Sequence, residues 1–197
     1  MTTQMMITMG EWRRFMKKAC TVFTIIAFMI FSLVLPAEAA ITTGSSTTAN
    51  SGSGFTVTIA KPADTVAGDV LVACIIATSG SASQPEVANP VGWQLIRHTE
   101  ANQGWLYDML TYYKVAGTNE PSSYIWTSTQ FNMSGGISRL AGVDLNHVVD
   151  VSAESQGQGS DLVAATAPSV TTGYTNDIVI NFFGSYQPLS MPYFSVP

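Results

Sequence analysis

Residues 55–78 have the sequence FTVTIAKPADTVAGDVLVACIIAT, and the two apolar runs within it decide the fold class. In residues 55–60, apolar and threonine side chains alternate, which is typical of a strand with one buried face. In residues 69–78, β-branched and other apolar residues occupy both faces, which predicts a central strand covered on two sides. Ala67 and Gly68 mark a turn before the second run. The stretch therefore predicts packed strands.

The rest of the chain repeats this pattern of short β-branched runs separated by turn residues. Strands are predicted at residues 93–100, 105–115, 123–129, 134–144, 162–172 and 176–185, with a short edge strand and a flexible loop within residues 145–160. No apolar run with a helical period follows residue 40. The sequence thus predicts an all-β fold, a two-layer antiparallel β-sandwich of the immunoglobulin-like or jelly-roll-like type.

The first 39 residues have the order of a secretory signal. A cationic stretch, residues 11–18, precedes an apolar run at residues 19–35, and then come Pro36 and the triplet Ala37-Glu38-Ala39. This order predicts a helical signal peptide, residues 1–39, that is cleaved after Ala39. The alternative is an uncleaved membrane anchor, but the apolar run is shorter than the roughly 20 residues that span a bilayer. We therefore expect a secreted, extracellular or cell-surface protein that meets the membrane only through this segment before cleavage.

Residues 40–54 are rich in Ser, Thr and Gly and almost free of apolar residues after Ile41. This composition predicts a flexible, exposed leader, with a ragged first strand as the alternative. The β-sandwich domain would then occupy residues 55–197.

Charge argues against nucleic-acid binding. The net charge is −5, and after Ala39 only Lys61, Arg97, Lys114 and Arg139 are basic, against eleven acidic residues. Neutralising phosphates requires clustered cations, and these four are scattered. The expected partners are other surface proteins or glycans.

The sequence shows no pattern of catalytic or metal-binding residues. Cys74 lies inside an apolar run, where a cysteine behaves as a small buried hydrophobe. His98 and His147 lie in separate segments without a carboxylate at a motif spacing, and no G-x-S-x-G elbow occurs. We expect no enzyme activity, no cofactor and no zinc site.

One acidic segment leaves two interpretations open. Asp144, Asn146 and Asp150 could supply oxygen ligands to Ca²⁺, which takes 6–8 of them. The segment lacks the D-x-D-x-D-G loop of a calcium site, and a solvated acidic turn is the alternative.

Aromatic residues of the run 105–115 suggest a ligand-binding surface. Trp105, Tyr107 and Tyr113 fall on one face of the predicted strand, and a row of rings could stack on sugars. Trp105, Tyr107 and Tyr112 are the candidate ligand-binding residues. Packing of these rings in the core is the alternative, because aromatic residues are large, apolar and favoured in strands.

Several segments together resemble a family of uncharacterised secreted β-sandwich domains from bacteria and phages. The resemblance spans residues 68–184, in order, and rests on GDVLVACIIAT, NPVGWQLI, TYYKVAG followed by EPSSYIWTST, GGISRLAGVD with HVVDV, and SVTT with NDIVINFFG. It implies an exported surface module without established catalytic residues. It also implies that Trp93 and Trp126 lie in the core.

The end of the chain departs from the family pattern. Members of the family continue past NDIVINFFG with further apolar strands, whereas this chain ends at residue 197. The resemblance implies a domain that lacks its last strand or strands, through a truncated gene or through an open slot that accepts a strand from another chain. The expected function is a secreted non-enzymatic module with a structural, adhesive or surface-assembly role. A carbohydrate-binding module and an unrecognised hydrolase are the alternatives.

Overall fold

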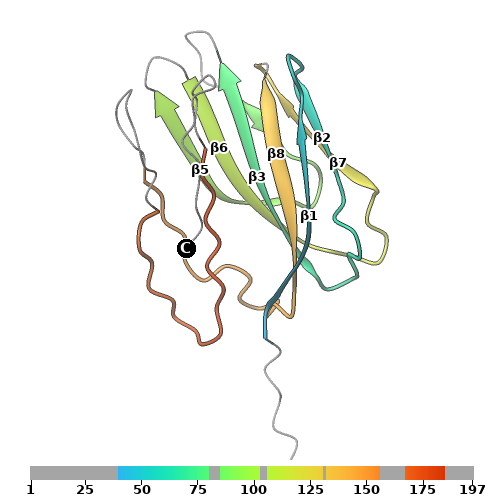
Figure 1. The fold of residues 1–197 in the computed structure, drawn as a ribbon, viewed down its shortest axis with the longest axis vertical. Helices are drawn as coiled ribbons and strands as arrows, with labels where there is room; N and C mark the ends of the chain where they lie inside the picture. Colours follow the sequence, from blue (N-terminus) through green and yellow to red (C-terminus); the bar gives the residue numbers. More distant parts are fainter. Residues whose placement is uncertain (1–39, 80–84, 103–105, 131, 156–166, 185–197) are drawn as a thin grey trace, which may run out of the picture. The chain divides into compact units, whose positions relative to one another are not determined.

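The computed structural model describes residues 40–79, 85–102, 106–130, 132–155 and 167–184. These residues contain β-strands and no helix (Figure 1). The strands are β1 (Thr42–Asn50), β2 (Thr56–Ala60), β3 (Val70–Ser79), β4 (Val87–Ala88), β5 (Gln94–Asn102), β6 (Leu106–Val115), β7 (Ser123–Ser128) and β8 (Met133–Ala141). In these ranges no helix has the length and apolar character needed to cross a membrane.

The strands form two antiparallel sheets. The large sheet has the order β1-β8-β3-β6-β5, and the small sheet has the order β2-β7-β4. The all-β prediction is confirmed, and the two sheets are consistent with the predicted β-sandwich (Figure 1). Strand β3 pairs with β6 on one side and β8 on the other, and both of its faces are covered, one by the main core and the other by a second apolar cluster, which explains its continuous apolar run.

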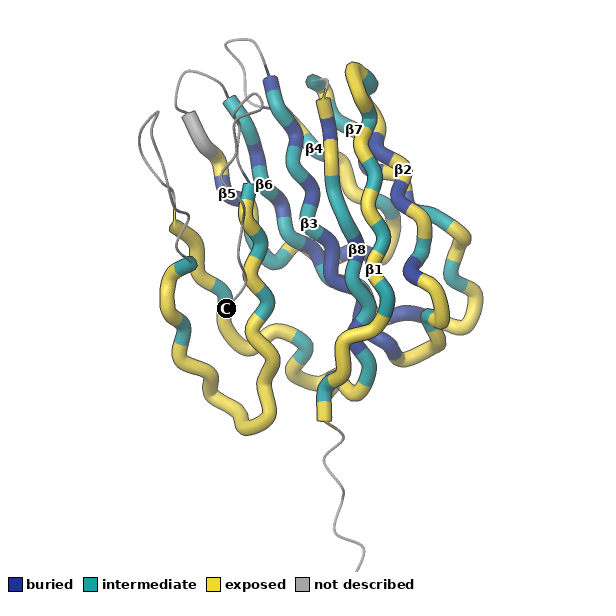
Figure 2. The backbone as a smooth tube through the Cα atoms, viewed as in Figure 1, coloured by how far each residue is buried: buried dark blue, intermediate teal, exposed yellow. Residues whose placement is uncertain are grey.

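The main core lies between the two sheets. Alternate residues of the strands turn inward and lose nearly all contact with solvent (Figure 2). The buried cluster comprises Val57, Ile59, Leu71, Ala73, Ile75, Ala77, Trp93, Leu110, Tyr112, Tyr124, Trp126, Met133 and Ile137. The Trp93 and Trp126 rings meet edge to face at 5.1 Å, as their implied place in the core requires.

The flexible-leader prediction is wrong for Thr42–Asn50, because this stretch forms β1 and pairs with β8. Its hydroxyl groups hold it in place. The Thr47 Oγ1 donates a hydrogen bond to the Ala60 carbonyl at 2.5 Å, and the Ser45 Oγ donates to the Ala63 carbonyl at 2.6 Å. These bonds join β1 of the large sheet to β2 of the small sheet and the loop after it, and so close one side of the sandwich.

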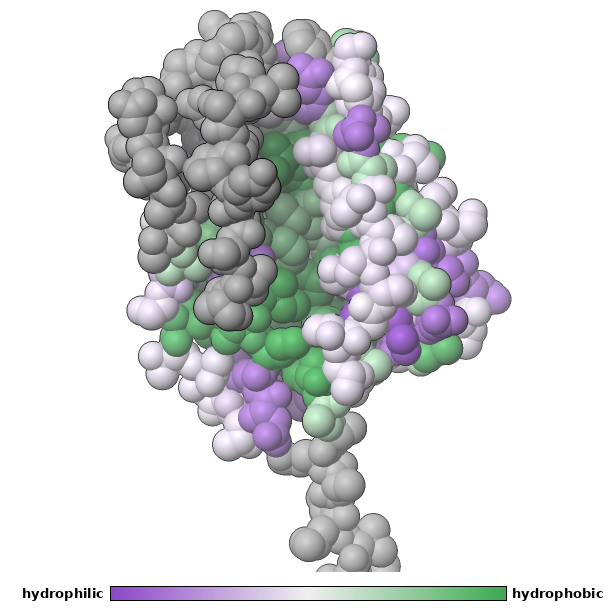
Figure 3. Space-filling view, in the orientation of Figure 1, coloured by the Kyte–Doolittle hydropathy of each residue, from purple (hydrophilic) through white to green (hydrophobic). Residues whose placement is uncertain are grey.

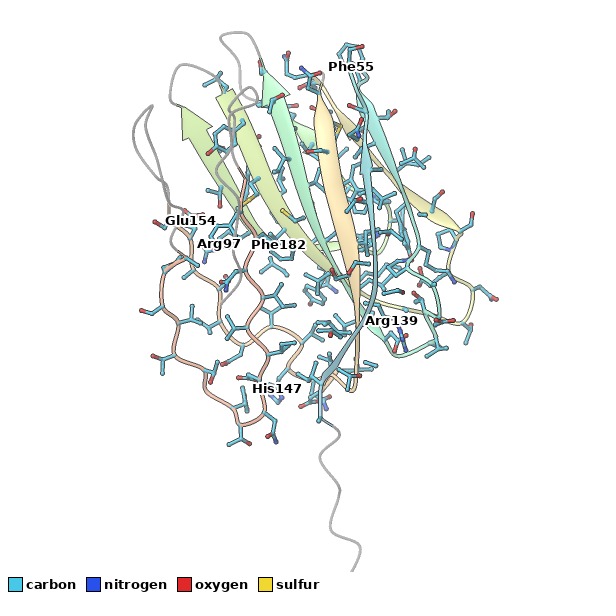
Figure 4. All side chains as sticks on the ribbon, in the orientation of Figure 1. Phe55, Arg97, Arg139, His147, Glu154 and Phe182 are labelled. Atoms are coloured by element: carbon cyan, nitrogen blue, oxygen red, sulfur yellow. The ribbon has the colours of Figure 1, made fainter. Side chains whose placement is uncertain are left out.

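An ion pair fixes the start of β3 against β8. The Arg139 Nε donates to the Asp69 Oδ2 at 2.6 Å, and the Val66 N–H donates to the same oxygen at 2.7 Å (Figure 4). The Asp69 carboxylate is almost completely buried. Hydrogen bonding from Arg139 holds the pKa of Asp69 below its usual value.

The prediction of strands after residue 144 is wrong for the residues that the structure describes. Residues 142–155 and 167–184 contain no strand, and the remaining part of the prediction lies outside the described residues. Ile180 and Phe182 instead pack on the outer face of the large sheet, together with Val70, Val72 and Leu140. The segment lies over the face of a sheet and not beside an edge, so its backbone makes no ladder (Figure 1).

The outer face of the large sheet is strongly apolar. Figure 3 shows apolar side chains gathered in a hollow of this surface. Arg97 on β5 anchors the segment that follows β8, because its Nη2 donates to the Ser152 carbonyl at 2.8 Å and its Nη1 lies 3.7 Å from the Glu154 Oε2 (Figure 4). The domain therefore has a second, smaller apolar layer outside the main core.

Candidate functional site

The structure describes only part of the predicted aromatic row. Tyr112 is a core residue that is 2% exposed, so the prediction that it binds a ligand is wrong. Tyr107 and Tyr113 share the outer face of the large sheet, but both are partly buried, and the Tyr113 hydroxyl donates to the Gln94 Oε1 at 2.7 Å. Trp105 lies outside the described residues. The described rings therefore offer no exposed stacking platform.

Cys74 is placed where a thiol is chemically inert. It lies on β3, is partly buried and forms no disulfide. Burial raises the pKa of the Cys74 thiol to about 12, so the reactive thiolate is scarce at neutral pH.

The acidic segment near Asp144 uses its carboxylate to hold its own turn. The Asp144 Oδ1 accepts hydrogen bonds from the Asn146 backbone N–H and from the Asn146 Nδ2, and the His147 Nδ1 lies 3.0 Å from the Asp144 Oδ2. The hydrogen bond with His147 is the main reason that the pKa of Asp144 is lowered. Asp150 accepts a hydrogen bond from Gly173 N–H. Among the described residues, no three His, Cys, Asp or Glu side chains form a group that could hold a metal ion.

A second acid–histidine pair joins the buried Asp108 to the exposed His98. Asp108 is 1% exposed, and the His98 Nε2 lies 3.1 Å from its Oδ2 and 3.9 Å from the Glu100 Oε1. Burial raises the pKa of Asp108, although His98 opposes the shift. The carboxylate of this pair is therefore enclosed, whereas the imidazole reaches the surface.

Replacing Asp108 by asparagine should make the protein more stable at pH 7 than the wild type, with little difference at pH 4. A folded-state pKa above the usual value of 3.8 means that folding favours the protonated acid, so wild-type stability falls as the pH rises through the raised value. Asparagine keeps the volume and removes the charge. Urea unfolding at both pH values measures the difference, and an equal effect at both would contradict the assignment.

The candidate binding site is an open pocket of about 440 Å³ beside β7. Two turns and the first residues of β7 form its walls, and Lys114 reaches it from the end of β6. The lining residues are Pro90, Val91, Lys114, Asn119, Glu120, Pro121, Ser123, Tyr124 and Ile125. We call this space the β7 pocket.

A closed polar network stands in the wall of the β7 pocket. The Glu120 carboxylate accepts hydrogen bonds from the Gly117 N–H at 2.7 Å and from the Tyr124 hydroxyl at 2.6 Å, and the Lys114 Nζ lies 3.2 Å away. Burial alone would raise the pKa of Glu120, but these three donors hold it below its usual value. A carboxylate satisfied in this way is unsuited to proton transfer and well suited to fixing the shape of the wall.

The turn at residues 89–92 supplies the opposite wall. Gly92 has a φ of 87°, and a Cβ at this position would lie 2.7 Å from the Lys114 Nζ. The positive φ favours glycine at this position, and the missing Cβ leaves room for the Lys114 ammonium group to approach. Trp93, which follows, inserts into the core and contacts Tyr124 edge to face at 5.1 Å. The PVGW turn and the Glu120 turn are thus locked to each other.

The rim of the pocket is apolar and exposed. Val91 is 97% exposed at the tip of its turn, and Ile125 is 51% exposed on the outer face of the small sheet. An exposed apolar rim beside a wall whose charges are paired is suited to contact with another molecule. Most of the lining residues belong to the sequence motifs NPVGWQLI and EPSSYIWTST, but the sequence did not indicate that they form a binding site.

Comparison of the chain with protein-family models, with curated proteins and with solved structures finds no match.

Proposed function

We propose that the protein is a secreted, non-enzymatic β-sandwich module with a structural, adhesive or surface-assembly role, and that it contacts its partner through the β7 pocket. The observation that carries this proposal is the pocket itself, because Val91 and Ile125 are exposed around a wall whose charges are already paired. The signal-like order of residues 1–39 supports export.

Polar chemistry in the described residues supports binding over catalysis. The Glu120 carboxylate binds three donors, and the Asp144 carboxylate accepts hydrogen bonds within its own turn. The Asp108 carboxylate is buried. Glu120 and Asp144 each have a structural task that a proton-transfer role would interrupt, and the Asp108 carboxylate is shielded from solvent.

Substituting Val91→Asp should lower retention of the purified protein on the surface of the producing cell about tenfold, the effect of losing one apolar anchor. The Val91 side chain makes little contact with its own fold, so the variant should unfold at the wild-type urea concentration. Leu145→Asp is the matched control, because Leu145 is also exposed but lies away from the pocket. Equal retention of all three proteins, or turnover of polysaccharide or ester substrates by the wild type, would contradict the proposal.

A further inference from the structure

Strand β7 has one edge that is only partly paired. Its even-numbered residues point their main-chain groups toward β2, because the Ser128 N–H donates to the Phe55 carbonyl at 2.8 Å and the Ser122 carbonyl accepts from Lys61 at 2.9 Å. The odd-numbered residues therefore point their N–H and C=O groups to the opposite side. The hydrogen bond of 3.1 Å from the Thr129 N–H to the Glu86 carbonyl confirms that direction.

The partner on that opposite side is too short. Strand β4 pairs with β7 only at Ser128 and Thr127 and ends at Ala88. The main-chain N–H and C=O groups of Ile125 and Ser123 therefore have no backbone partner among the described residues. Unpaired edge groups of this kind are a template for an added strand.

The unpaired edge coincides with the β7 pocket. Ser123 and Ile125 both line it, while Pro90 and Pro121 stand in its two walls. A space bounded by two turns suits a single extended segment better than the flat edge of another sheet. Its Lys114–Glu120 pair is neutral, which favours a segment with little charge.

The chain itself contains a segment of this chemistry. Residues 176–184, NDIVINFFG, contain three consecutive β-branched residues and two aromatic residues, and they carry a single charge, that of Asp177. In the structure they form no strand, and Val179 and Phe183 remain 57% and 45% exposed. One protein thus holds a strand-forming sequence outside any sheet and a sheet edge without a strand.

We propose that the β7 edge of one copy accepts residues 176–184 of a second copy as an added strand. This inference rests on the proposed assembly role of the β7 pocket and names its partner. The exchange replaces the contacts of Ile180 and Phe182 with the large sheet by contacts in the pocket, and it adds main-chain hydrogen bonds to Ile125 and Ser123. Donor and acceptor are different surfaces, so copies join head to tail into a ring or a fibre.

The Ile125→Pro variant tests the acceptor edge without disturbing the rest of β7. The Ile125 N–H points away from β2, so proline removes a donor that the single copy does not use, and its ring blocks the incoming strand. Sedimentation velocity over a range of concentrations should show oligomers for the wild type and for Ile125→Val, and single copies for Ile125→Pro. Circular dichroism checks that all three keep the same β content. Oligomers of unchanged size in Ile125→Pro, or single copies of the wild type throughout, would overturn the proposal.

A synthetic peptide, NDIVINFFG, tests the donor segment in trans. An excess should cap the acceptor edge and dissociate wild-type oligomers. An added edge strand uses the N–H groups of alternate residues only. We therefore compare two modified peptides, one N-methylated at Ile178 and Ile180 and the other at Val179 and Asn181, and only one of them should lose binding. One peptide should bind as the unmodified peptide does, and the other should bind at least about tenfold more weakly. Equal binding by both would overturn strand addition.

These experiments separate the two proposals. If Val91→Asp loses surface retention while the peptide fails to bind and Ile125→Pro assembles normally, the pocket has another partner and strand exchange is wrong. If Val91→Asp retains full surface binding, the proposed function of the pocket is itself wrong.

Discussion

Gly135→Val should destabilise the protein by about 3 kcal/mol, near the upper end of the cost of overpacking a core. A Cβ at this position of β8 would lie 2.6 Å from the Ile75 Cδ1 and 2.7 Å from the Cys74 carbonyl oxygen. It would also approach the Ile59 Cδ1 to 3.1 Å. The carbonyl belongs to the neighbouring strand of the large sheet and cannot move without breaking the β3–β8 ladder, so a side chain here forces the strands apart.

Urea unfolding followed by tryptophan fluorescence measures this loss, since Trp93 and Trp126 are buried in the core. Gly136→Ala is the matched control on the adjacent residue. Its Cβ would meet the Thr47 carbonyl oxygen and the Thr48 Cγ2 at 3.2 Å, contacts that a small shift of β1 relieves. We expect the control to cost less than about 1 kcal/mol. Equal midpoints for Gly135→Val and the wild type would show that β8 is not packed as described.

Apolar alternation was sufficient to locate the strands that build the core. Val57 and Ile59 face inward with Thr58 between them, and β3 is apolar on both faces because an apolar cluster covers each of them. The same signal failed for β1, whose Ser and Thr side chains are held by hydrogen bonds and not by apolar burial. It also failed for residues 176–184, which form no strand although Ile180 and Phe182 pack on the outer face of the large sheet.

The candidate site could not be predicted because its residues come from separate segments. Lys114 lies at the end of β6, Glu120 in the following turn and Gly92 in the turn before β5. Their contacts depend on the crossing of the chain from the small sheet to the large sheet after β4. The prediction for Tyr112 was wrong because Asp108 and Lys114 fall on the same face of β6. Charged residues on a strand face indicate exposure, yet this face is the inner one.

Glu120→Ala should destabilise the protein by about 3 kcal/mol, the cost of removing one partner from a buried charged network. The Glu120 side chain is 7% exposed, and its loss leaves the Lys114 ammonium, the Tyr124 hydroxyl and the Gly117 N–H without their acceptor. Because these groups hold the two walls of the β7 pocket together, we expect the turn at residues 117–121 to loosen. Hydrogen exchange of the Gly117 amide should therefore accelerate in the variant.

The pH dependence gives a second, independent test of the Glu120 network. The folded-state pKa of Glu120 is lowered from 4.5, so its stabilisation is present above pH 4.5 and is lost as the pH falls through the folded-state value. The stability difference between the wild type and Glu120→Ala should thus be large at pH 7 and shrink below pH 4.5. Glu86→Ala removes an exposed acid close to β7 and should change stability by less than about 0.5 kcal/mol at either pH. A constant difference for Glu120→Ala across this range would mean that alanine acts through lost packing, and that the carboxylate does not hold the pocket walls together.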